Sequence, residues 1–423
     1  MDTIKKIVIF STADNGGAGT YNLSLAEALV SIGHEVQIIV ANKFSNNKFV
    51  KQVKPTFGEL LRKKVKESIF KKQLALQRKV AKEANPDFYF FNYDEAAVFY
   101  NIDAFKRVIA FKPDVIIASW VSQLINTEQL SNLGFYFGAR LYTLMADMSP
   151  ITGGCHYAWD CKGYTTNCNN CPALPEQLQF VAAKNWQKKN EAIQKAKIKG
   201  IPFSPWGKNQ MSNAGLFKHQ KHFQTLQGYI NPTIFNTDAR NIAKEYFKIP
   251  KEKIAILVGA IDTKEKRKGA KFLLEALVHI SINNASLLQN VVLLVVGNSS
   301  NTTSAVPIYQ IPFIKDERLL ALLYQSADFY ANTSIEDTGP QMVLQAMACG
   351  AIVVSFPIGF GSEFLPNQQA IIATEVSQLA YTNAISNALT LTVAEKLQMQ
   401  QASLEKIKLE NGIQSVKDFA NYL

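Results

Sequence analysis

Asp337 and Gln345 lie eight positions apart in the segment 333–350, at a spacing that could place both on one side of a ligand. A polar turn containing Gly and Pro opens this segment, and a predicted helix with an apolar face follows and ends at Gly350. Eight residues make about two helical turns, so the two side chains share nearly one face. The free N–H groups of a helix N-terminus suit an anionic or hydroxyl-rich ligand.

Two further segments carry groups that could bind phosphate. Gly16 and Gly17 follow a predicted strand and precede a predicted helix, where the missing Cβ atoms let the backbone approach a ligand. Arg267 and Lys268 could bind a phosphate group through charge-assisted hydrogen bonds. A tight turn explains the glycines equally well, and a solvated basic turn is the alternative for the two cations.

Four cysteines lie within 17 residues of a segment, 150–175, that is rich in Gly, Asn and Pro. Their spacing is Cys-x5-Cys-x6-Cys-x2-Cys, and it predicts a closed structural zinc site, with free thiols as the main alternative. Four protein ligands leave no open position, so this metal is not expected to be catalytic. The predicted ligands are Cys155, Cys161, Cys168 and Cys171.

Bulk composition favours a two-domain protein without a membrane span. The chain has 423 residues, of which 47% are hydrophobic, and it contains no run of 18 apolar residues. The N-terminal apolar stretch 7–10 is short and is followed by a polar turn, so it predicts a first buried strand instead of a signal peptide. We expect a cytoplasmic protein, in which disulfides are uncommon.

The net charge of +11 is concentrated locally, because the segment 51–82 holds eleven Lys or Arg residues against two Glu. Interspersed apolar residues at helical spacing predict a basic amphipathic helix, which suits an anionic membrane surface. A solvated helix packed on its own domain is the alternative. No nucleic-acid motif accompanies the charge, so nucleic acid is not an expected partner.

Strands and helices alternate through two successive halves, which predicts two α/β domains of the doubly wound type. We expect an N-terminal domain over 1–205, a C-terminal domain over 206–400 and a C-terminal helix over 401–423 that packs back on the first domain. The predicted strands are 7–10, 36–40, 115–119, 141–145, 253–259, 291–297, 328–332 and 353–356, and the predicted helices include 20–32, 186–199, 269–280 and 317–326.

These motifs resemble those of the retaining glycosyltransferases of family 4, which have the GT-B fold of two facing Rossmann-like domains with a cleft between them. The residues that carry the resemblance span essentially the whole chain. They are Gly16-Gly17-Ala18, the segment from Gln210 to Phe235, Lys266-Arg267-Lys268-Gly269, and Asp337 through Ala346-Met347-Ala348-Cys349-Gly350. Asp147-Met148 and Thr152-Gly153-Gly154-Cys155-His156-Tyr157 are similar to a subgroup of colanic-acid, capsule and exopolysaccharide transferases.

The resemblance implies transfer of a hexose from a UDP- or GDP-sugar with retention and without a catalytic metal. The expected acceptor is a polyprenyl-diphosphate-linked glycan or other glycan at the inner face of a bacterial plasma membrane, which implies peripheral attachment. Catalytic roles fall to Asp337 and Asp147. Donor binding falls to Gly16, Gly17, Arg267, Lys268, Thr338, Gly339, Gln341 and Gln345, with Gln345 facing the ribose.

Three positions depart from the family pattern. Ala146 stands where the subgroup has His, Ala260 stands near the usual place of an Arg, and Gln345 replaces an acidic residue. Ser149 also replaces a common aromatic residue, and His156 lies nearby in sequence. A catalytically weakened homologue that acts as a partner or scaffold subunit is therefore an alternative, and a soluble sugar-nucleotide enzyme is a third.

Overall fold

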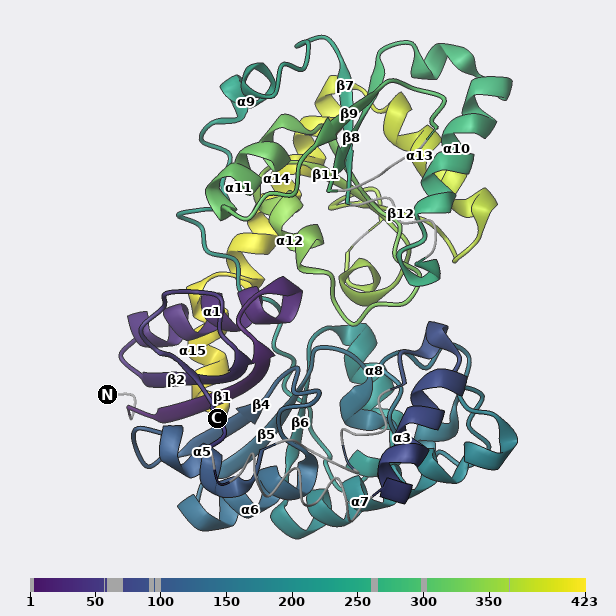
Figure 1. Cartoon of the computed structure of the whole chain (residues 1–423). Helices are drawn as coiled ribbons and strands as arrows, with labels where there is room; N and C mark the ends of the chain where they lie inside the picture. Colours follow the sequence, from purple (N-terminus) through teal and green to yellow (C-terminus); the bar gives the residue numbers. More distant parts are fainter. Residues whose placement is uncertain are drawn as a thin grey trace. The chain divides into compact units, whose positions relative to one another are not determined.

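The computed structural model describes residues 4–56, 58, 71–90, 95, 100–259, 265–297, 303–364 and 366–423. The chain forms two compact units. The first contains Met1–Phe203, Gly207–Leu226 and Val416–Leu423, and the second contains Ser204–Trp206 and Gln227–Ser415. Each unit is built around its own sheet (Figure 1).

The first unit's sheet has six strands among the described residues, all parallel, in the order β3-β2-β1-β4-β5-β6. This is the doubly wound order in which the chain reverses direction across the sheet between β1 and β4. The strands are β1 (Lys6–Ala13), β2 (Glu35–Asn42), β3 (Val50–Gln52), β4 (Val115–Ala118), β5 (Arg140–Met145) and β6 (Lys199–Pro202). The helices are α1 (Gly16–Ser31), α3 (Lys71–Glu83), α5 (Ile102–Val108), α6 (Thr127–Phe137) and α7 (Phe180–Ala196), with most of α8 (Pro205–Asn213) and α15 (Ile413–Tyr422).

The second unit repeats the same plan in its described residues, with six parallel strands in the order β12-β11-β10-β7-β8-β9. The reversal lies between β7 and β10. The strands are β7 (Ile254–Val258), β8 (Val291–Val296), β9 (Ile308–Ile311), β10 (Phe329–Asn332), β11 (Ile352–Ser355) and β12 (Ile371–Ile372). The helices are α9 (Arg240–Tyr246), α10 (Ala270–Asn283), α11 (Glu317–Ser326), α12 (Gln341–Ala348), α13 (Gln378–Thr390) and α14 (Val393–Glu410).

The central strands are apolar throughout because helices cover both faces of a parallel sheet. Every residue of β8 is buried, and so is every residue of β4, β10 and β11. In the second unit α10 and α13 pack together and join the strands in one hydrophobic core. The predicted α/β class with two Rossmann-like domains is confirmed, since both sheets are parallel and doubly wound.

Several predicted boundaries are wrong. The expected turn over 14–19 and helix from Thr20 become a helix that begins at Gly16 itself. The helix predicted to reach Lys199 ends at Ala196, because Lys197 adopts a left-handed conformation with φ of 52°, and Lys199 then starts strand β6. Strand β9 was not predicted; it is a four-residue edge strand whose first three residues are partly or fully exposed, so its apolar pattern is weak.

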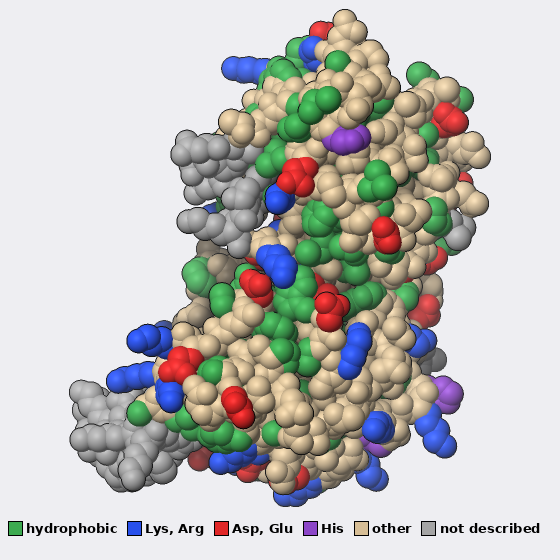
Figure 2. Space-filling view, turned by 90° about the vertical axis from the view of Figure 1, so that its right-hand side faces the viewer, with side chains coloured by type: hydrophobic (Ala, Val, Ile, Leu, Met, Phe, Trp, Pro, Cys, Tyr) green, Lys and Arg blue, Asp and Glu red, His purple; other side chains and the backbone are tan. Residues whose placement is uncertain are grey.

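The basic segment 51–82 is described only in part, since residues 57 and 59–70 lie outside the described residues. Its last part is helix α3, where Arg78, Lys79 and Lys82 are exposed and Val80 is fully buried. This turn of α3 therefore packs on its own unit. On the face shown in Figure 2, Lys and Arg side chains are spread over the surface with Asp and Glu between them. No helix in the described part of the chain is long and apolar enough to span a membrane.

Candidate active site

Asp337 lies at the centre of a partly buried ionic cluster in the second unit. Its Oδ2 atom is 2.9 Å from Nη1 of Arg267 and 3.2 Å from Nζ of Lys268. The guanidinium also contacts Oε1 of Glu265 at 2.8 Å, so four charged groups share the site. We call Glu265, Arg267, Lys268 and Asp337 the Asp337 cluster. Of the two cations, Arg267 has a side chain that is 10% exposed and Lys268 one that is 39% exposed.

Backbone contacts hold the two basic residues beside the loop that follows β10. The N–H of Ile335 donates to the carbonyl of Arg267 at 2.9 Å, and the hydroxyl of Thr333 donates to the carbonyl of Lys268. Gly269 makes this approach possible, because a Cβ at that position would lie 2.1 Å from the Thr333 carbonyl oxygen. Its φ of +59° also favours glycine. The Lys-Arg-Lys-Gly motif is therefore a turn shaped to meet the Asp337 loop.

The cluster keeps the Asp337 carboxylate charged. Burial raises the pKa of Asp337, but Lys268 and Arg267 together with an N–H bond from Gly339 outweigh burial and leave this pKa below its ordinary value. Tyr330, buried nearby, has a raised pKa because of burial and because of the negative charge of Asp337. The site thus offers a fixed anion and one partly exposed cation, Lys268, that can reach an incoming ligand.

Helix α12 does not present both of its predicted polar side chains to the cluster. The Oε1 atom of Gln345 accepts a hydrogen bond from the buried hydroxyl of Tyr324 at 3.2 Å. The side-chain nitrogen of Gln341 is buried close to the backbone of Gly228 and has no hydrogen-bond partner among the described residues. Gly339 donates its N–H to Asp337, and the Thr338 carbonyl accepts from Ser204. Ala260 lies outside the described residues.

Asp147 has a different partner in the first unit. Its Oδ2 is 2.6 Å from Nδ1 of His156, and its Oδ1 accepts the N–H of Ser149 at 2.8 Å. The other ring nitrogen, Nε2 of His156, lies 3.2 Å from the hydroxyl of Ser122. All three side chains are buried: Asp147 is 4%, His156 3% and Ser122 5% exposed. We call Asp147, His156 and Ser122 the Asp147 relay, since the imidazole bridges a carboxylate and a hydroxyl.

The carboxyl ends of neighbouring strands bring two members of the relay together. Ser122 follows β4 and Asp147 follows β5, and these strands pair side by side. His156 enters from the loop after Asp147, where its backbone carbonyl accepts from Met148 and its N–H donates to Phe88. In open α/β sheets, ligands bind outside this edge. Burial raises the pKa of Asp147, but the charge and hydrogen bond of His156, with bonds from Ser149, hold it below its ordinary value.

The glycines after β1 lie at the same edge of the first sheet. Gly16 has φ of +69°, which favours glycine, while a Cβ at either Gly16 or Gly17 would meet no atom within 4 Å. The space above this backbone is therefore open in the unit. The neighbouring Asp14 has a structural role, because its carboxylate accepts two backbone N–H bonds and the Ser45 hydroxyl from the loop after β2.

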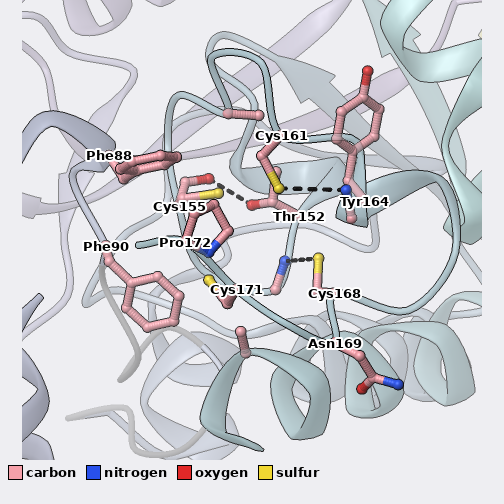
Figure 3. Close-up of a pocket in the computed structure, with 14 residues that line it drawn as sticks. Phe88, Phe90, Thr152, Cys155, Cys161, Tyr164, Cys168, Asn169, Cys171 and Pro172 are labelled. Carbon is pink, nitrogen blue, oxygen red and sulfur yellow. Dashed lines mark hydrogen bonds between the residues drawn. The ribbon is translucent and has the colours of Figure 1, made fainter. Parts of the chain in front are cut away.

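The four cysteines of segment 150–175 line one small cavity, together with Phe88, Phe90 and Tyr164 (Figure 3). Burial is the main reason that two of these thiols resist ionisation: it raises the pKa of Cys168 to about 12 and that of Cys171 to about 11. No group of three or more His, Cys, Asp or Glu side chains in the described ranges is already arranged to hold a metal ion. All four are free cysteines.

Sequence reasoning missed two members of these sites and one contact. Ser122 and Glu265 gave no motif, and the contact of His156 with Asp147 depends on the fold of the intervening loop. The signal for His156 was its position, nine residues after Asp147, in a chain that has Ala146 where the subgroup has His. The structure thus supplies an imidazole to Asp147 from a different place in the sequence.

The family comparison locates a known domain in the second unit. Residues 252–390 match the family model described as glycosyl transferases group 1, a range that includes the whole Asp337 cluster. No curated protein matches the chain.

Solved structures with the same fold cover nearly the whole chain. A sucrose-phosphate synthase from Thermosynechococcus elongatus has a TM-score of 0.64 at 15% identity, covering 99% of this chain and 98% of that one. WaaG, a glycosyltransferase involved in lipopolysaccharide biosynthesis, has a TM-score of 0.61 at 13% identity, covering 98% and 99%. Anabaena Alr3699/HepE in complex with UDP-glucose has a TM-score of 0.58 at 12% identity, covering 99% and 98%.

At these identities the solved structures establish the fold, and the match over 252–390 connects this fold to a class of enzymes. Residues 252–390 therefore form a glycosyl transferase group 1 domain within the predicted GT-B fold, and the protein is a transferase enzyme.

Proposed function

We propose that this protein transfers a hexose from a nucleotide sugar, UDP- or GDP-linked, to a glycan acceptor with retention of anomeric configuration. The observation that carries the proposal is the Asp337 cluster, which lies inside the segment that matches the group 1 glycosyltransferases. Nucleotide-sugar binding is further supported by the solved neighbour HepE, whose structures hold UDP, UDP-glucose, or UDP and glucose.

Lys268 and Arg267 are the proposed diphosphate-binding groups. Lys268 is the more exposed of the two, and its ammonium is held only by Asp337 among the ion pairs of the described residues. An incoming diphosphate would compete with Asp337 for this ammonium and accept a charge-assisted hydrogen bond in its place. As the glycosidic bond breaks, negative charge grows on the diphosphate, and a fixed cation stabilises that charge most in the transition state.

Asp337 is the proposed ligand for the hexose. Once a diphosphate draws Lys268 away, the carboxylate can accept hydrogen bonds from sugar hydroxyls and stabilise oxocarbenium-like positive charge. Gly339 keeps one carboxylate oxygen in place through its N–H, so the group is oriented before the ligand arrives. Thr338 and Gln341 would contribute through their backbones, and Gln345 would accept from a ribose hydroxyl, more weakly than a carboxylate.

In the first unit, the Asp147 relay is the proposed second polar centre, with Gly16 and Gly17 giving backbone access beside it. The His156 imidazole, polarised by Asp147, can donate or accept one hydrogen bond through its other nitrogen, which now contacts Ser122. A hydroxyl of the hexose or of the acceptor could take the place of Ser122. This role extends the proposal of Asp147 as a catalytic residue, with His156 as the group that touches the ligand.

The proposed acceptor is a lipid-linked or polysaccharide glycan, such as a polyprenyl-diphosphate-linked glycan, in bacterial cell-surface polysaccharide synthesis. The supporting observation is the basic composition of segment 51–82, of which Arg78, Lys79 and Lys82 are exposed in α3. These side chains would attach the protein to an anionic leaflet at the inner face of the plasma membrane. Flotation with anionic vesicles, abolished by high salt, would support this part; equal flotation with neutral vesicles would contradict it.

Calorimetric binding of UDP, GDP and their hexose conjugates tests the donor site. We expect one nucleotide series to bind, and Lys268→Ala to weaken it about 10- to 100-fold through loss of a charge-assisted bond. The matched control is Lys271→Ala, which removes an exposed lysine three residues away that pairs only with Glu275 among the described ion pairs. Equal affinity in both variants would overturn the proposed role of Lys268.

A second candidate function is that of a weakened homologue serving as a partner subunit. The observation that favours it is Gln345, whose acceptor oxygen is already engaged by Tyr324 and which lacks the charge of the family's acidic residue. If no nucleotide sugar binds to the folded protein, this candidate replaces the enzyme proposal. Detection of hexose transfer or hydrolysis of one donor would eliminate it.

A further inference from the structure

The four cysteines of the loop between β5 and α7 line one small cavity although they come from different turns. Figure 3 shows their sulfur atoms around a common space, with the rings of Phe88 and Phe90 on one side. The cavity has a volume of about 10 Å³, which is roughly the room of one water-sized sphere. A site of this size fits a single ion and excludes both an organic ligand and a multinuclear cluster.

Backbone N–H groups point at the sulfur atoms. The N–H of Gly153 donates to Sγ of Cys168 at 3.2 Å, and that of Gly163 donates to Sγ of Cys161 at 3.4 Å. Such donors stabilise a negatively charged sulfur more than a neutral thiol, so they would favour metal-bound thiolates at Cys161 and Cys168.

Among the described residues, the two basic side chains closest to the cysteines in this loop donate to or pair with other groups. Lys189 is buried, and its ammonium donates to the carbonyl oxygens of Ser149 at 2.7 Å and Thr152 at 3.1 Å. His156, next to Cys155, has both ring nitrogens occupied by Asp147 and Ser122. The four sulfur atoms are therefore the metal ligands that the described residues offer at this cavity.

Tight turns bring the last pair of sulfurs together. Cys168 and Asn170 both adopt left-handed backbone conformations, with φ of 56° and 54°, at a cost in free energy for residues that carry a Cβ. The two-residue spacing between Cys168 and Cys171 is that of a chelating pair in structural zinc sites. Bond formation to a metal would offset the cost of these turns.

We propose that Cys155, Cys161, Cys168 and Cys171 bind one structural Zn²⁺ ion through four thiolates, and that this ion fixes the loop that carries His156. The described side chains are not yet arranged as a metal-holding group, so binding requires rotation of the cysteine side chains toward the centre of the cavity. The four thiols lose their protons to solvent as the Zn–S bonds form, leaving a tetrahedral site of net charge −2. With no open position, the ion holds the loop and does not take part in the reaction.

Metal analysis of the full chain, purified in reductant without added metal, tests the proposal. We expect about one zinc per chain in the wild type and in Cys349→Ala, and less than about a fifth of that in Cys168→Ser and Cys171→Ser. Cys349 is the matched control, because it is a buried free cysteine of the second unit. Zinc loss in the control as well would contradict the assignment.

A second measurement uses wild-type protein alone, in case the serine variants fail to fold. Co²⁺ exchanged into the chain should give the intense thiolate-to-cobalt absorption and the d–d bands of a tetrahedral site, and a mercurial reagent should release the ion as thiols react. Iron in place of zinc, disulfides among the four cysteines, or folded protein that takes up neither Zn²⁺ nor Co²⁺ would overturn the proposal.

Discussion

The two units share one strand order but hold a buried carboxylate in different ways. Asp337 is paired with two basic side chains, Arg267 and Lys268. Asp147 is paired with an imidazole and a backbone N–H. In both units burial raises the carboxylate pKa and the partners lower it below the ordinary value. The same edge of the same fold therefore gives one site suited to anions and one suited to hydroxyl groups.

The largest effect is expected from Asp337→Asn, which removes the anion shared by the two cations. Turnover should fall about 100- to 1,000-fold, as when one preorganised electrostatic group is lost from an active site. The affinity for a nucleotide that carries no sugar should be retained or rise, because the residue at position 337 no longer competes with phosphate for Lys268. Steady-state kinetics and calorimetry measure the two quantities.

The control for this variant is Glu275→Gln, a charge-neutralising change at an exposed pair with Lys271. An equal loss of turnover in both proteins would mean that charge balance, and not the contact of Asp337 with the sugar, determines the rate.

The next effect concerns the first unit, where His156→Ala would leave the Asp147 carboxylate buried and without its imidazole. The free energy of unfolding should fall by about 3 kcal/mol, the scale for removing one partner of a buried ion pair. Urea unfolding at neutral pH measures it. His219→Ala, at an exposed histidine of the same unit, is the matched control. If both variants lose the same stability, the relay is not an energetic unit.

Glu363 shows what happens to a carboxyl group of the second unit that lacks such partners. Burial raises its pKa to about 8, against an ordinary 4.5, while Lys406 lowers it and Glu410 raises it. Because the pKa of Glu363 is raised in the folded state, its contribution to the free energy of unfolding is complete below about pH 4.5. That contribution is lost as the pH rises through about 8. Glu363→Gln should therefore stabilise the protein at pH 9, by on the order of 1 kcal/mol.

Urea unfolding of Glu363→Gln at several pH values checks this expectation. Glu252→Gln, at an exposed position, should follow the wild-type pH dependence. A wild-type protein whose stability is constant between pH 5 and pH 9 would show that Glu363 is ionised in the folded state.

The smallest effect is expected at α12. Gln345→Glu restores the acidic residue of the family pattern and still accepts from the Tyr324 hydroxyl. Nucleotide affinity should rise a few-fold, since a charged acceptor binds a ribose hydroxyl more strongly than an amide. Unchanged affinity, with the protein folded, would mean that the residue supports Tyr324 and does not face the ribose. Calorimetry with the nucleotide series is the measurement.

The sequence was sufficient to predict the doubly wound fold, because central parallel strands are apolar throughout and alternate with helices. The family motifs in the sequence also predicted that Arg267, Lys268 and Asp337 belong to one site, and the three side chains are in contact. Strand β9 was missed since an edge strand of four residues with exposed positions resembles a loop. The contact of His156 with Asp147 was missed because it depends on how the loop 148–156 folds back, which no local pattern encodes.

Gly269 has a consequence for how the protein can vary over generations. It carries no chemistry, yet any substitution would place a carbon atom 2.1 Å from the Thr333 carbonyl and force the Lys-Arg-Lys turn away from its loop. A saturation library selected for function should therefore accept almost nothing but glycine here, while the exposed neighbour Lys271 should accept many residue types. Tolerance to substitution at Gly269 and Lys271 would then depend more on the space around the backbone than on the chemical role of the side chain.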